Sequence, residues 1–418
     1  MKLMLAAALL LCTSAFAQQA PAPEGCTVCH GKEAHDLSRS IHAKAAISCT
    51  SCHGGDPAAL EVEAAHGKQL KRYKTPREVL ESCGSCHSDV QRMRLYGLRT
   101  DQLSLYWTSK HGEKLALDGD PNVATCISCH GTHDVLKVSD TRSPVHPFNQ
   151  VVTCGRCHAD EKLMSQYKLK SDVVEQYRHS IHGRALLEEE HSGAPACATC
   201  HGSHGANPPR TRDIEQVCGQ CHSVVQAHYD ESPHAKAAAA GRSSVQCNSC
   251  HGSHTIRQPS PEMLVGDEEG HCGSCHLDEK DAARAIGAQL REGILNLGSL
   301  IDSAEQDLHS AAGRGLFLGP EKAYLEDARG LLVRARASTH RLSPPAQVDL
   351  LDRGQAMVQK TREEFAREGR ILRDRKIYTG IFCALTAVFG LVLLMYGRTI
   401  RGEWKRTLRS DGEVAGGD

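Results

Sequence analysis

A five-residue motif, Cys-x-x-Cys-His, constrains this chain more than any other feature, because it occurs nine times between residues 26 and 276. Each copy sets two thiols three positions apart and an imidazole directly after the second thiol. A single copy could be chance, a redox disulfide or a zinc ligand pair. Nine copies exclude chance, and a histidine fixed beside every second cysteine has no role in a tetrahedral zinc site. The nine copies are Cys26/Cys29/His30, Cys49/Cys52/His53, Cys83/Cys86/His87, Cys126/Cys129/His130, Cys154/Cys157/His158, Cys197/Cys200/His201, Cys218/Cys221/His222, Cys247/Cys250/His251 and Cys272/Cys275/His276.

The spacing of the motif matches the attachment site of a c-type haem. Two thiols on one turn of chain can form thioethers with the two vinyl groups of a porphyrin, and the adjacent histidine can ligate the iron from the proximal side. The motifs therefore predict nine covalently bound haem c groups. Aromatic residues make up only 4% of the chain, so the porphyrins themselves are expected to form the core of this region.

On these motifs the chain resembles the multihaem c-type cytochromes, over roughly residues 26–276. The arrangement is also similar to the haem packing of the multihaem nitrite reductase and hydroxylamine oxidoreductase type. The resemblance implies haem attachment outside the cytoplasm of a bacterium. It also implies bis-histidine ligation, in which the distal histidine often comes from the segment of another haem.

The motifs come in two alternating forms, which together make an internal repeat. Glycine follows the motif at the copies that begin with Cys49, Cys126, Cys197 and Cys247. Glycine lies inside the motif at the copies that begin with Cys83, Cys154, Cys218 and Cys272. The unequal intervals between copies favour a repeated haem arrangement with variable loops over a strict solenoid. Frequent Pro, Gly and polar turns predict short helices joined by loops.

Two repeated contexts supply candidate distal ligands. Ser-x-His precedes a motif at His42, His111, His182 and His234, and His66 is a relaxed version of this context. Cys-His-Gly-x-His gives His133, His204 and His254, and His35 is a looser equivalent after the first motif. The substitutes are His146, His179, His191, His228 and His271, and His309 and His340 are expected to be exposed. Methionine could serve at most three haems, through Met93, Met164 or Met263, so a largely bis-histidine, low-potential chain is expected.

Composition and hydropathy divide the rest of the chain. The N-terminus has a lysine, an apolar run and Ala15-Phe16-Ala17, which is typical of a signal peptide. After His276 an apolar stripe of Ile286, Leu290, Ile294, Leu297 and Ile301 predicts an amphipathic helix over about 278–311. A second helix is expected from Pro320 to about His340 and a third from Ala346. Residues 377–397 carry no charge and are long enough to span a bilayer. The domains are expected at 1–17 (signal peptide), 18–276 (nonahaem domain), 277–376 (helical stalk), 377–397 (transmembrane helix) and 398–418 (cytoplasmic tail).

The expected fold is mainly α with much irregular loop: a cytochrome domain wrapped on nine haems, then a helical hairpin or long helix and one transmembrane helix. A net charge of −1 gives no basic field that would indicate nucleic acid. The signal peptide places the haem domain in the periplasm and the tail in the cytoplasm, on the bacterial inner membrane.

Saturated irons favour electron transfer over chemistry. The expected function is an electron relay in respiration, from a membrane donor, through a quinol-oxidising subunit, to a periplasmic or outer-surface acceptor. The C-terminal helices could also pair with themselves or with a partner. The alternative is a multihaem oxidoreductase of the nitrite, hydroxylamine or sulfur-oxyanion type with one open haem. Nitrite reductases of that type often have lysine as the proximal ligand of the catalytic haem, whereas all nine motifs here end in histidine. No residue is therefore singled out as catalytic.

Overall fold

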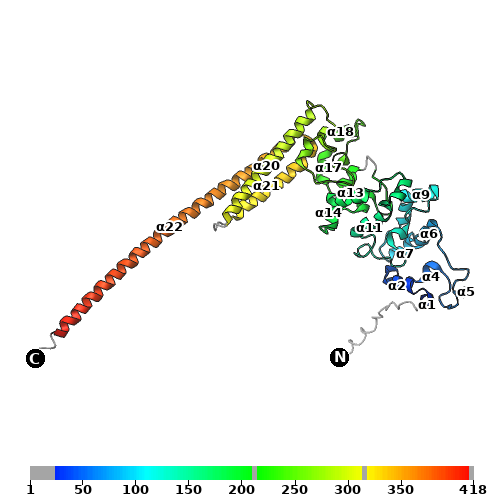
Figure 1. The fold of residues 1–418 in the computed structure, drawn as a ribbon, viewed down its shortest axis with the longest axis horizontal. Helices are drawn as coiled ribbons and strands as arrows, with labels where there is room; N and C mark the ends of the chain where they lie inside the picture. The colour runs from blue at the N-terminus through cyan, green and yellow to red at the C-terminus, as the bar shows by residue number, and fades with distance from the viewer. Residues whose placement is uncertain (1–23, 210–213, 313–317, 414–418) are drawn as a thin grey trace, which may run out of the picture. The chain divides into compact units, whose positions relative to one another are not determined.

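The computed structural model describes residues 24–209, 214–312 and 318–413, and in these residues the regular structure is helical without strands (Figure 1). This confirms the mainly α fold class, while wrapping on nine haems stays a prediction. The chain divides into two compact units, Met1–Gln220 with Gln246–Pro259 and Cys221–Val245 with Ser260–Asp418. The second unit therefore includes two motif histidines, His222 and His276. The expected signal peptide, residues 1–17, lies outside the described residues.

The first unit consists of short helices joined by loops, as the frequent Pro and Gly residues predict. Its helices are α1 (Cys26–Cys29), α2 (Gly31–Arg39), α3 (Ile41–Lys44), α4 (Cys49–His53), α5 (Val62–Ala65), α6 (Pro76–His87), α7 (Val90–Arg94), α8 (Gln102–Thr108), α9 (Lys110–Asp118), α10 (Cys126–His130), α11 (Pro147–His158), α12 (Glu161–Gln166), α13 (Val173–His179), α14 (Ile181–Leu187), α15 (Cys197–His201), α16 (Ile214–Gly219) and α19 (Cys247–His251).

Where glycine follows the motif, the motif is itself a five-residue helix: α4, α10, α15 and α19. The third residue of each helix is Ser or Thr, and its hydroxyl accepts a hydrogen bond of 3.0–3.1 Å from the backbone N–H of the residue before the first cysteine. The following glycine has a positive φ of 67–81° in all four copies. That conformation ends the helix and is costly for any residue with a Cβ.

Where glycine lies inside the motif, the motif ends a longer helix that begins at a proline, as in α6 and α11. A Cβ added at Gly84 would lie 2.5 Å from the Leu103 side chain of α8, and one at Gly155 would lie 3.4 Å from Val174 of α13. The internal glycine therefore lets the next helix pack directly on the motif. In α6 and α11, as in the motifs followed by glycine, the helix ends at the motif histidine.

The second unit has a three-helix bundle as its core. Its elements are α17 (Ser223–Asp230), α18 (Pro233–Ala239), η1 (Pro261–Leu264), η2 (Cys272–Ser274), α20 (Ala282–Ala312), α21 (Gly319–Ser338), η3 (Thr339–Arg341) and α22 (Pro344–Glu413). Helices α20, α21 and the first part of α22 run side by side (Figure 1). The three predicted helices are confirmed to within a few residues of the predicted ends.

The predicted apolar stripe of α20 forms the centre of the bundle. Leu290, Ile294, Leu297 and Ile301 are all less than 5% exposed, and Ile286 is half-buried. They pack against Leu325, Ala328 and Leu332 of α21 and against Leu351 and Val358 of α22. Gly354 of α22 faces Leu297, where a Cβ would lie 2.6 Å from Leu297 Cδ2. The missing side chain lets α20 and α22 approach closely.

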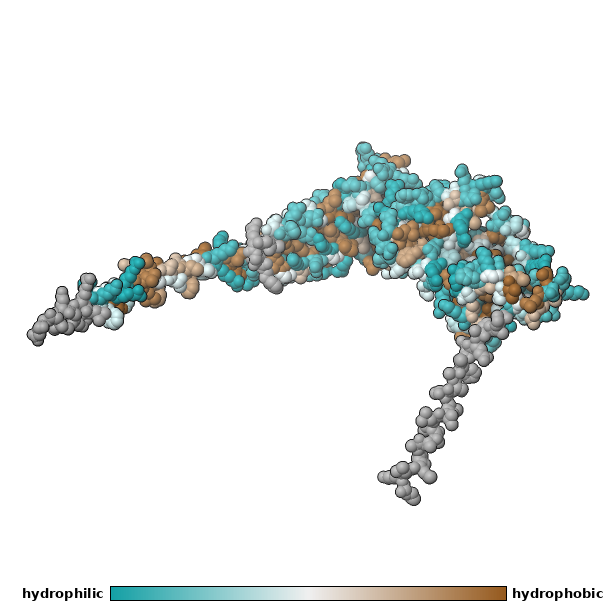
Figure 2. Space-filling model, turned by 60° about the horizontal axis from the view of Figure 1, so that its bottom comes forward, coloured by the Kyte–Doolittle hydropathy of each residue, from teal (hydrophilic) through white to brown (hydrophobic). Residues whose placement is uncertain are grey.

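Helix α22 leaves the bundle and continues without a break through the predicted transmembrane segment. By length and composition it could cross a membrane, with a mean hydropathy of 2.3 over its most apolar window, none of which is buried. Figure 2 shows this stretch as a brown band with hydrophilic residues on both sides. The apolar stretch thus begins inside a continuous helix instead of after a linker.

The bundle core gives a first testable prediction. Leu297→Ala should lower the free energy of unfolding of the bundle by about 2–5 kcal/mol, because it removes a fully buried side chain and leaves a cavity. The measurement is chemical denaturation of the full chain in detergent, followed by far-ultraviolet circular dichroism. The control is Leu295→Ala on the same helix, since Leu295 is 40% exposed. Equal losses for the two variants would contradict this packing.

Candidate functional site

The structure brings motif histidines together with candidate distal histidines. In the described residues, seven such pairs have ring centroids 5.9–6.2 Å apart. They are His30–His66 (6.0 Å), His42–His87 (6.1 Å), His53–His133 (6.2 Å), His111–His158 (6.2 Å), His130–His204 (6.0 Å), His201–His254 (5.9 Å) and His234–His276 (6.2 Å). Every pair joins one residue of a Cys-x-x-Cys-His motif to one residue of the two repeated contexts.

This separation fits two imidazoles on opposite sides of one metal ion. With metal–nitrogen bonds of about 2 Å and each nitrogen about 1 Å from its ring centroid, two opposed ligands have centroids about 6 Å apart. A haem iron needs only two ligands from the protein. In the part of the chain that the structure describes, no three His, Cys, Asp or Glu side chains form a site for a bare ion. Paired histidines beside two cysteines are the donor set that a c-type haem requires.

Ring stacking is the alternative explanation for such pairs. Aromatic pairs prefer particular geometries, with ring centroids 4.5–7 Å apart. Here the interplanar angle ranges from 11° in His130–His204 to 59° in His42–His87, while the separation varies by only 0.3 Å. A constant distance with a variable angle is expected of ligands on a common axis, which can rotate freely about it.

Six of these seven pairs follow two rules that the sequence left open, and His30–His66 follows neither. A motif with internal glycine pairs with the preceding Ser-x-His, as in His87 with His42, His158 with His111 and His276 with His234. A motif followed by glycine pairs with the next Cys-His-Gly-x-His, as in His53 with His133, His130 with His204 and His201 with His254. The two histidines of each such pair thus come from the segments of different motifs, which is the arrangement that the family resemblance implies for a distal ligand.

The Ser-x-His context is the start of a helix. Ser40, Ser109, Ser180 and Ser232 are buried N-cap residues, and each hydroxyl accepts a hydrogen bond of 2.9–3.1 Å from a backbone N–H of the first helical turn. The cap starts helices α3, α9, α14 and α18, and the histidine is the second residue of each. A serine cap stabilises a helix by about 1 kcal/mol and here also fixes where the histidine lies.

A tyrosine that the sequence reasoning missed completes this context in three copies. Tyr106, Tyr177 and Tyr229 stand three residues before the capping serine, and their hydroxyls donate to the carbonyls of Ala124, Pro195 and Val245. Each of these carbonyls lies two residues before the first cysteine of a motif. Burial raises the pKa of Tyr106 and Tyr177 to about 12, so both hydroxyls remain donors. The signal was the repeated pattern Tyr-x-x-Ser-x-His.

Several motif histidines are oriented through their second ring nitrogen. The Nδ1 atoms of His53 and His201 contact the carbonyls of Lys71 and Asn207 at 3.3 and 3.1 Å. Since a carbonyl only accepts, Nδ1 carries the proton and Nε2 presents its lone pair. His276 Nδ1 instead lies 2.7 Å from the Asp281 carboxylate. Such outer hydrogen bonds fix the orientation of metal-ligating histidines and raise their basicity.

Burial keeps many of these imidazoles in the neutral form that binds a metal. Desolvation is the largest cause in every case, and the positive charge of a neighbouring histidine adds to it in most. Metal binding requires the deprotonated imidazole, so this environment favours ligation at neutral pH. The pKa is lowered at His42, His87, His111, His130, His158, His204, His234 and His254.

The two cysteines of a motif differ in exposure in seven of the nine copies. The first cysteine is half-buried in every copy, whereas the second is half-buried only at Cys86 and Cys129. In α4, α11, α15 and α19 the second cysteine is the last residue but one of the helix, so no later turn covers it. The described motif cysteines form no disulfide bonds, and their thioethers stay a prediction. The exposed second cysteines are Cys29, Cys52, Cys157, Cys200, Cys221, Cys250 and Cys275.

Polar side chains of the same segment lie beside two of the second cysteines. The Arg92 guanidinium lies 3.2 Å from Cys86 Sγ, and the Ser274 hydroxyl lies 3.9 Å from Cys275 Sγ. In both motifs glycine lies inside the spacing.

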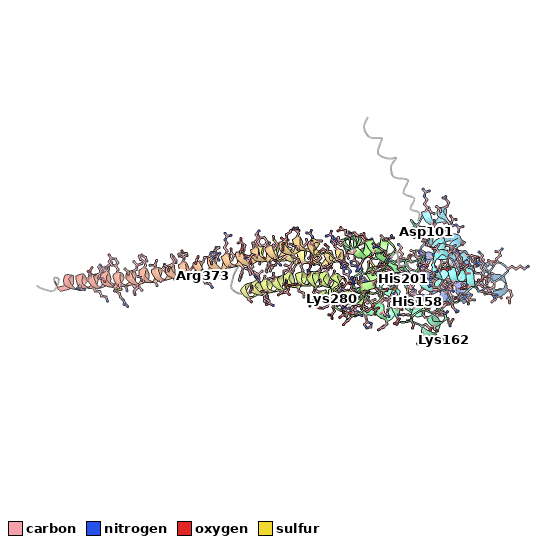
Figure 3. All side chains as sticks on the ribbon, turned by 90° about the horizontal axis from the view of Figure 1, so that it is seen from above. Asp101, His158, Lys162, His201, Lys280 and Arg373 are labelled. Atoms are coloured by element: carbon pink, nitrogen blue, oxygen red, sulfur yellow. The ribbon has the colours of Figure 1, made fainter. Side chains whose placement is uncertain are left out.

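Successive motifs lie next to one another in the first unit. The thiol of Cys83 is hydrogen-bonded to that of Cys126, and the thiol of Cys154 to that of Cys197; both contacts raise the pKa of the first thiol. Charge interactions also link Cys49 to Cys26, Cys52 to Cys83, and Cys129 to Cys154. These contacts connect the first six motifs in sequence order. His158 and His201, which belong to neighbouring motifs, interact and lie close together in Figure 3.

Not every candidate histidine is placed beside a motif histidine. His35 is exposed on α2 and contacts no other histidine ring in the described residues. Met93 and Met164 are buried at 7% and 4% exposure. His309 is exposed as expected, but the expected exposure of His340 is wrong. His340 is half-buried because η3 lies against α17, a tertiary contact that no helical periodicity indicates.

Comparison with known proteins does not assign this chain to a family. No protein-family model matches the chain, and no curated protein matches it significantly in sequence. The paired histidines, the motif cysteines and their caps therefore carry the functional interpretation.

The histidine-bearing helices give a second prediction. Gly112 follows His111, and a Cβ there would lie far inside van der Waals contact with the Tyr106 carbonyl. Gly112→Ala should therefore shift the start of α9, displace His111 from His158 and lower stability by about 1–3 kcal/mol. Thermal unfolding and the absorption spectrum measure the two effects. The control is Gly31→Ala, because a Cβ at Gly31 meets nothing within 4 Å. An unchanged spectrum and melting temperature in Gly112→Ala would contradict the geometry.

Proposed function

We propose that this protein is a membrane-anchored nonahaem cytochrome c that relays electrons between a membrane-bound donor and a periplasmic or outer-surface acceptor. The observation that carries the proposal is the set of histidine pairs 6 Å apart, each with one member in a Cys-x-x-Cys-His motif. When bound at such pairs, haem iron supplies one-electron chemistry by changing between the ferrous and ferric states.

Ligation from both sides favours a carrier over an enzyme. A distal histidine occupies the position that a small substrate would need, and it keeps the coordination unchanged when the charge changes. Histidine pairs about 6 Å apart occur in both units, for example His111–His158 in the first and His234–His276 in the second. An oxidoreductase of the nitrite or hydroxylamine type would need one motif histidine without such a neighbour.

The adjacency of motifs supports conduction through the chain. Contacts from Cys26 to Cys49 and onward to Cys197 keep six attachment sites in an unbroken series, and Cys218 and Cys247 adjoin in the same way. Centres held this closely can exchange electrons with their neighbours without moving. Local hydrogen bonds at the start of α4, α10, α15 and α19 fix four of these motifs, so they do not depend on one large apolar core.

Helix α22 is the proposed anchor. At 1.5 Å per residue, the helix extends about 50 Å between Pro344 and Ile377, where the apolar stretch begins. A single helix with an exposed apolar surface offers no pocket for a quinone. The proposed donor is therefore a separate quinol-oxidising membrane subunit. We place the motif region in the periplasm and the tail after residue 397 in the cytoplasm, on the bacterial inner membrane, because c-type haem is attached outside the cytoplasm.

The test is haem quantification combined with electron paramagnetic resonance of the purified, oxidised full chain. Intact mass should exceed the mass of the mature polypeptide by nine haem groups, and the spectrum should contain only low-spin haem. A smaller mass increment would refute the nonahaem assignment. A high-spin signal from one haem in nine would instead identify an open iron, and the protein would then be tested as a nitrogen- or sulfur-oxyanion reductase.

The carboxylate beside the last motif gives a further prediction. Asp281→Asn removes the negative charge 2.7 Å from His276 Nδ1 and keeps the shape of the side chain. The reduction potential of that haem should rise by on the order of tens of millivolts, since a tenfold change in relative affinity for the ferric state corresponds to about 59 mV. A spectroelectrochemical titration measures the shift. Asp278→Asn is the matched control, because Asp278 accepts only from a backbone N–H.

The anchor gives another prediction. A chain ending at Leu372 keeps the bundle core of α20, α21 and the first part of α22 but lacks the exposed apolar stretch. It should fractionate as a soluble periplasmic protein with its haems attached, whereas the full chain should sediment with membranes and be released by detergent. Continued sedimentation of the shortened chain would show that another subunit also holds it at the membrane.

A further inference from the structure

The repeated contexts supply one distal ligand fewer than nine haem irons need. Nine irons closed on both sides need nine distal ligands, and of the nine candidates His35 is exposed and contacts no histidine ring in the described residues. The rule that pairs His53, His130 and His201 with the following Cys-His-Gly-x-His segment also ends in the sequence, because no such segment follows His254. The ninth donor must therefore come from outside the repeated contexts.

We infer that His340, at the tip of the helical bundle between α21 and α22, is an axial ligand of a haem iron. This inference rests on the proposed haem content. It makes the bundle part of a haem site as well as a support for the membrane helix. Three independent observations carry it: the tautomer that the ring adopts, the way its segment is held, and the neighbouring histidines.

The ring of His340 has the same arrangement as the motif histidines. Its Nδ1 donates to the carbonyl of Ala337 at 3.0 Å, as the Nδ1 atoms of His53 and His201 do to Lys71 and Asn207. This hydrogen bond puts the ring proton on Nδ1, so Nε2 carries the lone pair. Burial is the largest cause that lowers the pKa of His340. Neutral imidazole with its proton on Nδ1 is the form that ligates through Nε2.

The segment that carries His340 is fixed against a helix that starts at a motif. Element η3 packs on α17, whose N-cap is His222. Arg341 donates to both carboxylate oxygens of Glu231, at 2.7 and 3.3 Å, just after α17 ends. On the other side Ser338 and Thr339 are buried and bond back to Ala335 and Arg336. These contacts restrict the position of the ring to the side of α17.

Neighbouring charges place His340 close to the motif that contains Cys221. His228 and His222 both lower the pKa of His340 through their positive charge, so both rings lie near it. His222 is a proximal ligand in the proposed function. The rule for motifs with internal glycine already gives the iron of His222 a donor in the preceding Ser-x-His segment, so His340 would serve the iron of a haem next to that one.

The other spare histidines fit less well. His146 Nδ1 accepts from the backbone N–H of Phe148 as a helix cap, so its proton is on Nε2, the nitrogen that would have to bind. His179 is 76% exposed and pairs with Glu175, and His309 is exposed on α20. His228 is the nearest competitor, because it lies on α17 and its Nδ1 is buried without a hydrogen-bond partner in the described residues.

The experiment uses the full chain purified in detergent and compares His340→Gly with the unaltered protein. The haem mass should stay at nine groups, because the cysteines hold the porphyrin. One haem in nine should change from low-spin to high-spin in the electron paramagnetic resonance spectrum, and the ferrous protein should gain one carbon monoxide site. Added imidazole should restore the low-spin spectrum by filling the space of the missing side chain.

Matched variants separate this result from other causes. His309→Gly and His228→Gly should both leave the spectrum unchanged. The inference is overturned if His340→Gly keeps the unaltered spectrum, if imidazole does not remove the high-spin signal, or if His228→Gly alone creates it. Fewer than nine haem groups in the unaltered protein would refute the proposed function itself, which is a different outcome from nine haems with an unchanged spin state.

Discussion

The rest of the structure depends on pairs of imidazoles held about 6 Å apart, wide enough for one metal ion between them. The first unit has few buried apolar side chains: apart from the cluster around Leu80, Tyr106 and Leu115, its buried residues are scattered singly. A core of this kind cannot by itself stabilise so many short helices, which are marginal in isolation. Ligand bonds across each proposed haem would supply the missing cohesion, and metal binding would then be coupled to folding.

Local helix chemistry sets up these pairs. A buried serine cap places each Ser-x-His ring on the first turn of its helix, and a glycine with positive φ ends four of the motif helices, α4, α10, α15 and α19, directly after the histidine. Tyrosine hydroxyls then connect the two, from the helix before the cap to the loop before the next motif. Two rings from distant parts of the sequence therefore meet because both are fixed by backbone hydrogen bonds. Packing of large apolar side chains is not required to position the two rings.

The helical bundle is instead held together by packing of apolar side chains. Leu297, Ile301 and Val358 are almost fully buried, and glycine at 293 and 354 lets α20 and α22 approach closely. This apolar packing fixes the start of α22, which continues as one rigid helix into the apolar stretch. With His340 as a ligand, the bundle would connect the haem chemistry of the molecule to its membrane helix through three residues of η3.

The sequence alone determined the nine motifs, the alternation of their two forms, the apolar stripe of α20, the three long helices and the membrane-length apolar stretch. These features depend on spacing along one segment, which the residues themselves define. Only the tertiary structure decided which histidines meet, because pairing such as that of His53 with His133 joins residues far apart in the sequence and leaves no local pattern. The unequal exposure of the two cysteines in a motif, as at Cys154 and Cys157, was likewise decided by what packs around each helix end. From the sequence alone His340 was expected to be exposed. Its burial comes from contact with α17, more than a hundred residues earlier in the chain, and no local pattern indicates such a contact.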